Sequence, residues 1–311
     1  MYLLYLIVFG VIVTALIGLV ASWIDRKVTA RIQYRVGPPF LQPFRDIVKL
    51  LGKETLIPRG SSRVMFMLAP VIGFSAVAMA STILWINSGR VFGNESFQSF
   101  LGDILVVIYL LAIPSISIML GGFASGNPVA RVGASREMKL LLSYELPFIL
   151  VVLVPIIKSG FSLRLEEILK MQAMDGAFAL SVSGILALIV FVLVMQAKLA
   201  FVPFDMPEAE TEIISGPLTD YSGTSLAMFK LMKNMLLFTL PFFMVILFLG
   251  GFHLDGIRIL YSVLKYVIIL LVITVIRNTN PRLRIDQAMK IFWGPVTALA
   301  VVAVIFAILG M

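Results

Sequence analysis

The chain has 311 residues, of which 60% are hydrophobic and only 14% are charged. Soluble globular chains carry roughly 45–50% apolar and about 25% charged residues, so this composition excludes an ordinary water-soluble domain. The net charge of +8 does not indicate nucleic-acid binding, because the basic residues gather in loops beside apolar segments. The sequence contains no cysteine, which excludes iron–sulfur ligation and thiolate metal sites within it. Any redox centre is therefore expected on a partner.

Apolar runs predict an all-α integral membrane protein of about eight transmembrane helices in one polytopic domain, 1–311. Each run has about 20 residues, the length that crosses a hydrocarbon core roughly 30 Å thick. The expected spans lie near 2–24, 65–88, 101–123, 138–159, 178–201, 224–250, 259–277 and 289–310. The first run lacks a basic leader and a small-residue cleavage site, so we expect it to be retained.

Basic residues set the expected orientation. The loop after the first span contains nine Lys or Arg residues, whereas the loop after the second contains only Arg90. By the positive-inside rule the first loop faces the cytoplasm, and with eight spans both chain ends lie on the outer side. Within this loop, apolar residues at helical spacing predict an amphipathic helix on the cytoplasmic side: Leu41, Phe44, Ile47, Val48 and Leu51, opposite Arg45, Lys49 and Lys53. It either lies in the membrane interface or packs on a partner subunit.

Two glutamates lie at or within the predicted fourth span. Glu137 leads into the span and Glu145 follows it, about 12 Å further along a helix and so below the lipid headgroups. Pro147 frees the backbone carbonyl of Ser143. Intramembrane acids usually mark ion pathways, so we predict a role in ion coupling. The alternative is a structural acid paired with a Lys or Arg on a neighbouring helix.

The loop at 202–223 is unexpectedly acidic for a cytoplasmic loop. It contains no Lys or Arg, and four of its acids cluster beside two prolines: Asp205, Glu208, Glu210 and Glu212. Clustered carboxylates raise one another's pKa values and can share or pass protons. A solvated loop that docks on a basic partner explains the composition equally well.

Two lysines in the sixth span, Lys230 and Lys233, lie three residues apart and so on one helix face. Lys230 can extend to the cytoplasmic edge, but Lys233 lies about 14 Å inside the span. A lysine at that depth needs a carboxylate partner or a lowered pKa. Glu145 is the expected partner.

Four separate motifs resemble those of the complex I subunit 1 family, also known as the H-type subunits, in the family's order and over nearly the whole chain. They are DRKVTARIQYRVGP at 25–38 with LQPF at 41–44, RE at 136–137 with SYELP at 143–147, PFDMPEAE at 203–210, and YSG at 221–223. The eight-span layout is also similar to that of the family.

Two departures distinguish the chain from the quinone-reducing branch of that family. That branch has an extra Asn- and Gly-containing segment after the Gly-Pro turn, whereas here Gly37-Pro38-Pro39-Phe40 continues directly into Leu41. The branch also tends to have Glu in the sixth span where this chain has Lys233. Both departures resemble the ferredoxin-dependent branch of group 4 membrane-bound [NiFe] hydrogenases and membrane-bound sulfane reductases.

The resemblance implies a non-catalytic membrane-anchor and ion-coupling subunit in a prokaryotic cell membrane. Its expected partners are a hydrogenase-like large subunit and an iron–sulfur subunit of a peripheral arm, together with antiporter-like membrane subunits. Iron–sulfur clusters, with or without a NiFe site, would lie in those partners, and no cofactor or metal in this chain. The predicted coupling residues are Glu137, Glu145, Asp205, Glu208, Glu210, Glu212, Lys230 and Lys233, and the predicted docking residues are Arg26, Lys27, Arg31, Arg35, Arg136, Asp220 and Tyr221.

Three alternatives stay open. The chain could form the quinone chamber of a true NADH:quinone oxidoreductase, which quinone analogues would inhibit. A stand-alone secondary transporter would use the same acids to bind a cation or substrate and would purify without iron–sulfur partners. A passive scaffold would use the acids only for docking, so that neutralising Glu145 would spare activity and coupling.

Overall fold

The computed structural model describes residues 2–92, 101–253 and 256–310, and in these ranges every regular element is a helix. The first helix combines α1 (Tyr2–Tyr5), η1 (Leu6–Val13) and α2 (Thr14–Ile32). The remaining long helices are α4 (Arg63–Phe92), α5 (Asp103–Ala124), α6 (Pro128–Lys158), α8 (Val182–Lys198), α10 (Gly223–Phe248) and α11 (Arg258–Thr279), followed by α12 (Ile285–Ile291), η5 (Phe292–Val296) and α13 (Thr297–Ile308). The shorter elements are α3 (Gln42–Leu51), α7 (Leu165–Asp175), η2 (Phe178–Leu180), η3 (Met206–Glu208), α9 (Glu210–Ile213) and η4 (Gly216–Leu218).

The prediction of an all-α membrane protein is confirmed. In the described part of the chain, seven helical segments are long and apolar enough to cross a membrane. The remaining predicted span, the fifth at 178–201, corresponds to α8, which is apolar but has only 17 residues. The amphipathic helix of the first loop is α3, which packs against α2 and α10.

The fourth helix differs most from its predicted bounds. It begins at Pro128 instead of 138, because the side chain of Asn127 accepts a hydrogen bond from the Val129 backbone and Pro128 occupies the first turn. Glu137 therefore lies in the interior of a 31-residue helix and not at its edge. The first helix likewise continues to Ile32, and the last begins at Ile285.

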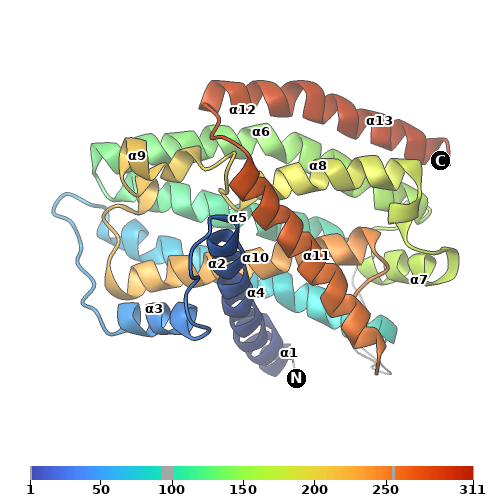
Figure 1. Ribbon diagram of the computed structural model, residues 1–311, viewed down its shortest axis with the longest axis horizontal. Coiled ribbons are helices and arrows are strands. Elements are labelled where there is room, and N and C mark those ends of the chain that lie inside the picture. The colour runs from blue at the N-terminus through green and yellow to red at the C-terminus, as the bar shows by residue number, and fades with distance from the viewer. Residues whose placement is uncertain (1, 93–100, 254–255, 311) are drawn as a thin grey trace.

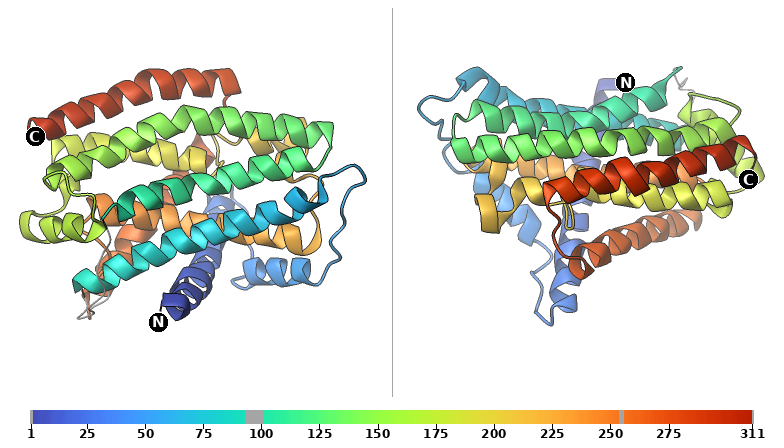
Figure 2. Two further views of the ribbon diagram at one scale, coloured as in Figure 1. Left: turned by 180° about the vertical axis from the view of Figure 1, so that it is seen from behind. Right: turned by 90° about the horizontal axis from the view of Figure 1, so that it is seen from above.

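The helices form two sets that cross. Helices α4, α5, α6, α8, α10 and α13 run roughly side by side, whereas α2 and α11 cross them at a steep angle (Figures 1 and 2). In its most apolar stretch α10 is 83% buried, against 22% for the first helix and 28% for the last, so α10 is the central helix. Gly18 permits the crossing of α2 over α10, because a Cβ there would lie 2.3 Å from the Asn234 carbonyl oxygen. This contact lies one residue from Lys233.

The two ends of the bundle differ in composition. One end, called here the charged end, carries the loops 33–62, 125–127, 199–222 and 280–284, with α3 and α9 at the left of Figure 1. The other, called the opposite end, carries α7, the described parts of the loops 159–181 and 249–257, and the C-terminal end of α13.

Candidate functional site

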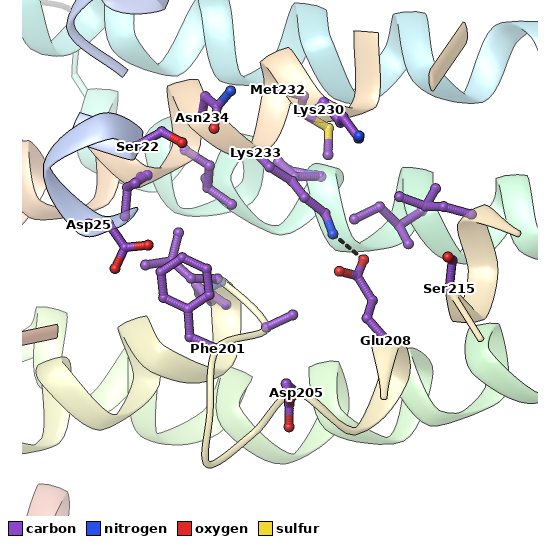
Figure 3. A pocket seen from close by; sticks show the side chains of 18 of the residues that line it. Ser22, Asp25, Phe201, Asp205, Glu208, Ser215, Lys230, Met232, Lys233 and Asn234 are labelled. Atoms are coloured by element: carbon purple, nitrogen blue, oxygen red, sulfur yellow. Dashed lines mark hydrogen bonds and ion pairs between the residues drawn. The ribbon is translucent and has the colours of Figure 1, made fainter. Parts of the chain in front are cut away.

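A cavity of about 740 Å³ opens among α2, α3, α8, α10 and the acidic loop at the charged end. Eleven of its lining residues are acidic or basic: Asp25, Asp46, Glu137, Asp205 and Glu208, with Arg26, Lys198, Lys230, Lys233, Arg277 and Arg282. Figure 3 shows Asp25, Asp205, Glu208, Lys230 and Lys233 around it. Ionisable residues within membrane proteins characteristically face such interior spaces, where water and counter-charges offset the cost of burial.

The acidic loop finds its counter-charges on three other elements. Asp205 pairs with Arg282 before α12, with 2.9 Å between Oδ2 and Nε, and Glu212 pairs with Arg136 of α6 at 2.5 Å. Glu208 pairs with Lys233 of α10, the contact dashed in Figure 3. The absence of basic residues from the loop itself is thereby explained. The side chain of Glu210 lies outside the described part of the structure.

The loop folds into the bundle between Pro203 and Glu208. Phe204 is buried against Phe292, with ring centres 4.8 Å apart, and the Pro203 carbonyl accepts a hydrogen bond from Leu283. Burial raises the pKa of Asp205, although the Arg282 guanidinium acts to lower it. Asp205 and Glu208 therefore line the cavity, whereas the side chain of Glu212 is 59% exposed.

A fourth ion pair joins Lys198 of α8 to Glu145 of α6, with 3.1 Å between Nζ and Oε2. The Lys198 side chain is only 1% exposed, and its ammonium lies 4.2 Å from the centre of the Phe148 ring. The prediction that Glu145 pairs with Lys233 is wrong, because Glu145 contacts α8 while Lys233 contacts the acidic loop. Lys198 is not among the predicted residues, although a single basic residue in the apolar run 178–201 is a usable signal.

Glu137 lies near both the Glu208–Lys233 pair and the Lys198–Glu145 pair. It is 3% exposed and hydrogen-bonded to Ser115, whose hydroxyl also contacts the Tyr144 hydroxyl at 2.9 Å. Lys198, Lys233 and Glu208 all act on it electrostatically. Among the cavity acids in the described ranges, Glu137 alone makes no ion pair within 4.0 Å. Its carboxyl group can therefore respond to both neighbouring pairs.

The cavity wall formed by α2, α3 and α11 contains two further ion pairs that the sequence did not predict. Asp25 accepts hydrogen bonds from Arg277, at 2.5 Å, and from Thr274, at 3.0 Å. Arg26 pairs with Asp46 of α3 at 2.9 Å. Burial acts to raise the pKa of Asp46, but hydrogen bonds from Arg26 and Gln42 outweigh it and lower the pKa. Helical spacing predicted α3 but could not show that Asp46 faces inward.

The predicted docking residues divide into exposed residues, residues held in ion pairs or hydrogen bonds, and one buried residue. Arg31 and Arg35 are exposed, and Lys27 donates to the Gly37 carbonyl. Arg26 and Arg136 make the partly exposed ion pairs described above, and Asp220 accepts a hydrogen bond from Asn127 at 3.0 Å. The docking prediction for Tyr221 is wrong. Its side chain is buried, stacked on Phe66 and hydrogen-bonded to the Phe66 carbonyl.

Fold and cavity together define a polytopic membrane protein with an ion-paired cavity at one end. The model of the NADH dehydrogenase family matches residues 4–308. The H-type subunit of NADH-quinone oxidoreductase from Thermomicrobium roseum is 36% identical, covering 95% of this chain and 92% of its own length. The second H-type subunit of the same enzyme from Syntrophobacter fumaroxidans is 32% identical, covering 94% and 91%.

A solved structure extends this similarity to three dimensions. A chain of the membrane-bound sulfane sulfur reductase (MBS), an archaeal respiratory membrane complex, superposes with a TM-score of 0.88 at 30% identity. The alignment covers 98% of this chain and 99% of that chain. The protein therefore belongs to the NADH dehydrogenase family, the subunit 1 or H-type family of complex I, as its motifs predicted. It is a membrane subunit of the complex I-like type.

Proposed function

We propose that this chain is the membrane-anchor and ion-coupling subunit of a ferredoxin-dependent respiratory complex of the hydrogenase or sulfane reductase type. It links a hydrogenase-like large subunit and an iron–sulfur subunit of the peripheral arm to antiporter-like membrane subunits that translocate protons or sodium ions. Its charged end faces the cytoplasm, and the metal centres belong to the partners. Arg31 in the last turn of α2 and Arg35 just after it, both exposed, contact the arm.

The observation that carries this proposal is the series of charged groups along the cavity. It runs from Asp205–Arg282 through Glu208–Lys233 and Glu137 to Lys198–Glu145. Two unit charges 4 Å apart interact by about 4 kcal/mol at an effective dielectric constant of 20, enough to change protonation. Redox-driven movement of the loop 203–212 would alter the Glu208–Lys233 pair. Glu137 would then change its charge, and the Lys198–Glu145 pair would respond.

Structural similarity supports the sulfane reductase and hydrogenase branch. A chain of the sulfane sulfur reductase superposes on 98% of this chain with a TM-score of 0.88. The short Gly37–Leu41 connection and Lys233, which pairs with Glu208 inside the cavity, are consistent with that branch.

A quinone chamber is the second candidate function. It is favoured by the 36% identity to an NADH-quinone oxidoreductase subunit and by a cavity volume within the 300–1,000 Å³ of small-molecule sites. Competitive inhibition of the purified complex by short-chain quinone analogues would establish this candidate. No inhibition, with iron–sulfur subunits and a four-cysteine NiFe large subunit co-purifying, would establish the hydrogenase type.

The test of ion coupling is Glu145→Gln in the complete complex reconstituted into vesicles. Ion pumping driven by ferredoxin oxidation should be abolished, while the complex still assembles. Glu166→Gln is the matched control, because Glu166 also pairs with a lysine, Lys170, but on α7 at the opposite end. If the Glu145→Gln complex pumped as many ions per ferredoxin oxidised as the wild type, Glu145 would not lie on the coupling path. A passive scaffold would then be favoured.

A further inference from the structure

Helix α3 carries an open groove on the face turned away from the bundle. The groove has a volume of about 410 Å³ and is lined by Leu41, Phe44, Arg45, Val48 and Lys49. Leu41 is 50% exposed and Val48 is 68% exposed, so this chain leaves much of the apolar floor uncovered. Two cations and no acid line the groove. Its chemistry is therefore apolar with a positive border.

The acid of α3 faces the other way. Pro43 and Ile47 are buried on the side that packs against α2 and α10. Asp46 lines the large cavity and is held there by Arg26 and Gln42, each at 2.9 Å. Arg45 and Lys49, four residues apart on one helix face, remain as the charges of the outer face. The helix thus separates the ion-paired cavity from a cationic outer groove.

An aromatic cluster indicates the depth of this groove in the membrane. Trp23, where α2 passes from its apolar to its charged part, contacts Phe40 with ring centres 5.2 Å apart, and Phe40 in turn lies 6.2 Å from Phe44. The Trp23 indole donates to the Pro38 carbonyl at 3.2 Å. Tryptophan concentrates at the level of the lipid headgroups. The groove therefore lies where phosphate groups and the first acyl carbons meet.

We propose that this groove binds an anionic phospholipid. The phosphate lies between Arg45 and Lys49, and the acyl chains cover Leu41, Phe44 and Val48. An amphipathic helix at the interface gains from both apolar burial and attraction to anionic lipid, and each basic residue near such a surface strengthens binding about fivefold. Of the two locations that the sequence left open for this helix, the geometry favours the membrane interface. This inference is independent of the proposed ion-coupling function.

The test measures binding of dioctanoyl phosphatidylglycerol to the purified, delipidated complex. The variant is Arg45→Gln with Lys49→Gln, and the matched control is Lys53→Gln with Arg59→Gln, which removes the same charge outside the groove. Wild type and control should bind the probe alike, and the double variant should bind roughly 25-fold more weakly. Dioctanoyl phosphatidylcholine should bind more weakly than phosphatidylglycerol, and inorganic phosphate should not displace the lipid.

Three outcomes would overturn the proposal. They are equal binding to all variants, displacement by inorganic phosphate alone, and loss of another subunit from the double variant while the lipid stays bound. Loss of a subunit with the lipid still bound would mean that this face of α3 binds a protein partner instead of a lipid. If the double variant does not assemble, a photoactivatable phosphatidylglycerol on the wild-type complex replaces it. Cross-links should then map to 41–49, and their absence there would refute the site.

Discussion

The two ends of the bundle bury polar groups in different ways. At the charged end, ion pairs line a cavity. At the opposite end, Gln172 of α7 forms hydrogen bonds through both the nitrogen and the oxygen of its side-chain amide. It donates to the Ile246 and Leu247 carbonyls at 2.9 and 3.2 Å and accepts from the Gly250 amide at 2.8 Å. Gln172 thereby joins α7 to the end of α10 through both its amide nitrogen and its amide oxygen.

Asp103 shows the same contrast among acids. It is fully buried at the start of α5, accepts from the Asn87 amide at 3.1 Å, and accepts from the Leu165 backbone at 2.9 Å, where α7 begins. Neither Asp103 nor Gln172 lines the large cavity. Hydrogen-bonded polar groups away from a cavity hold helix ends together, whereas ion-paired groups around a cavity keep alternative partners within reach. The comparison predicts different outcomes for substitutions at the two ends.

The largest effect is expected at Lys198. Lys198→Met leaves Glu145 without its counter-charge, and breaking a buried ion pair costs about 3–5 kcal/mol. We expect the lower part of this range, because Glu145 is 25% exposed. Thermal unfolding of the purified complex should show the loss, and vesicles should show no pumping.

The double variant Lys198→Met with Glu145→Gln separates folding from coupling. It should regain thermal stability, because no unpaired charge remains, but it should not regain pumping. Lys170→Met, which breaks the exposed pair on α7, should change the free energy of unfolding by no more than about 0.5 kcal/mol. It should leave ion pumping at the wild-type value. Normal pumping by Lys198→Met would show that the Lys198–Glu145 pair is structural.

Asp103→Ala should act on stability alone. It removes two hydrogen bonds to a buried acid and leaves the Leu165 amide unpaired, at a cost of about 2 kcal/mol. The melting temperature of the complex should fall, while pumping per assembled complex stays at the wild-type value. Asp175→Ala, exposed at the end of α7, is the control. Lost coupling in the assembled Asp103→Ala complex would abolish the distinction between the two ends.

A smaller effect is expected where the loop after α3 meets α10. The Thr55 hydroxyl accepts a hydrogen bond from the Thr224 backbone at 3.2 Å and so caps α10 from another segment. Thr55→Ala should cost about 1 kcal/mol, like the loss of an ordinary N-cap. Hydrogen exchange in the first turn of α10 should accelerate, and Thr55→Ser should restore it. Ser61→Ala, which removes only a local turn contact, should leave α10 unchanged.

Sequence reasoning predicted the helices and the family because both depend on local pattern. Apolar runs indicated the spans, and helical spacing indicated α3. The start of α6 was missed because Asn127 and Pro128 stand in a polar stretch, although that pair is a helix-start signal. The ion pairs joining 145 with 198, 208 with 233 and 205 with 282 depend on how helices rotate against one another and on the inward fold of the acidic loop. Composition and spacing carry no such information.

The smallest predicted effect is a pH dependence at Asp205. Burial raises the pKa of its carboxyl above the ordinary value of 3.8, although Arg282 acts to lower it. The folded loop therefore binds this proton more tightly than the unfolded loop does. The stability of the loop is highest below pH 3.8, falls as the pH rises through the interval up to the raised pKa, and is constant above it.

Hydrogen exchange at the amides of 204–208, corrected for the intrinsic pH dependence of exchange, measures this slope as an opening free energy. Asp205→Asn should flatten the profile, because the titrating group is gone. Asp286→Asn, at an exposed acid in the first turn of α12, should leave it unchanged. A slope of the opposite sign would mean that attraction to Arg282 outweighs burial. Asp205 would then be a fixed anion that anchors the loop, and the responsive part of the charged end would begin only at Glu208.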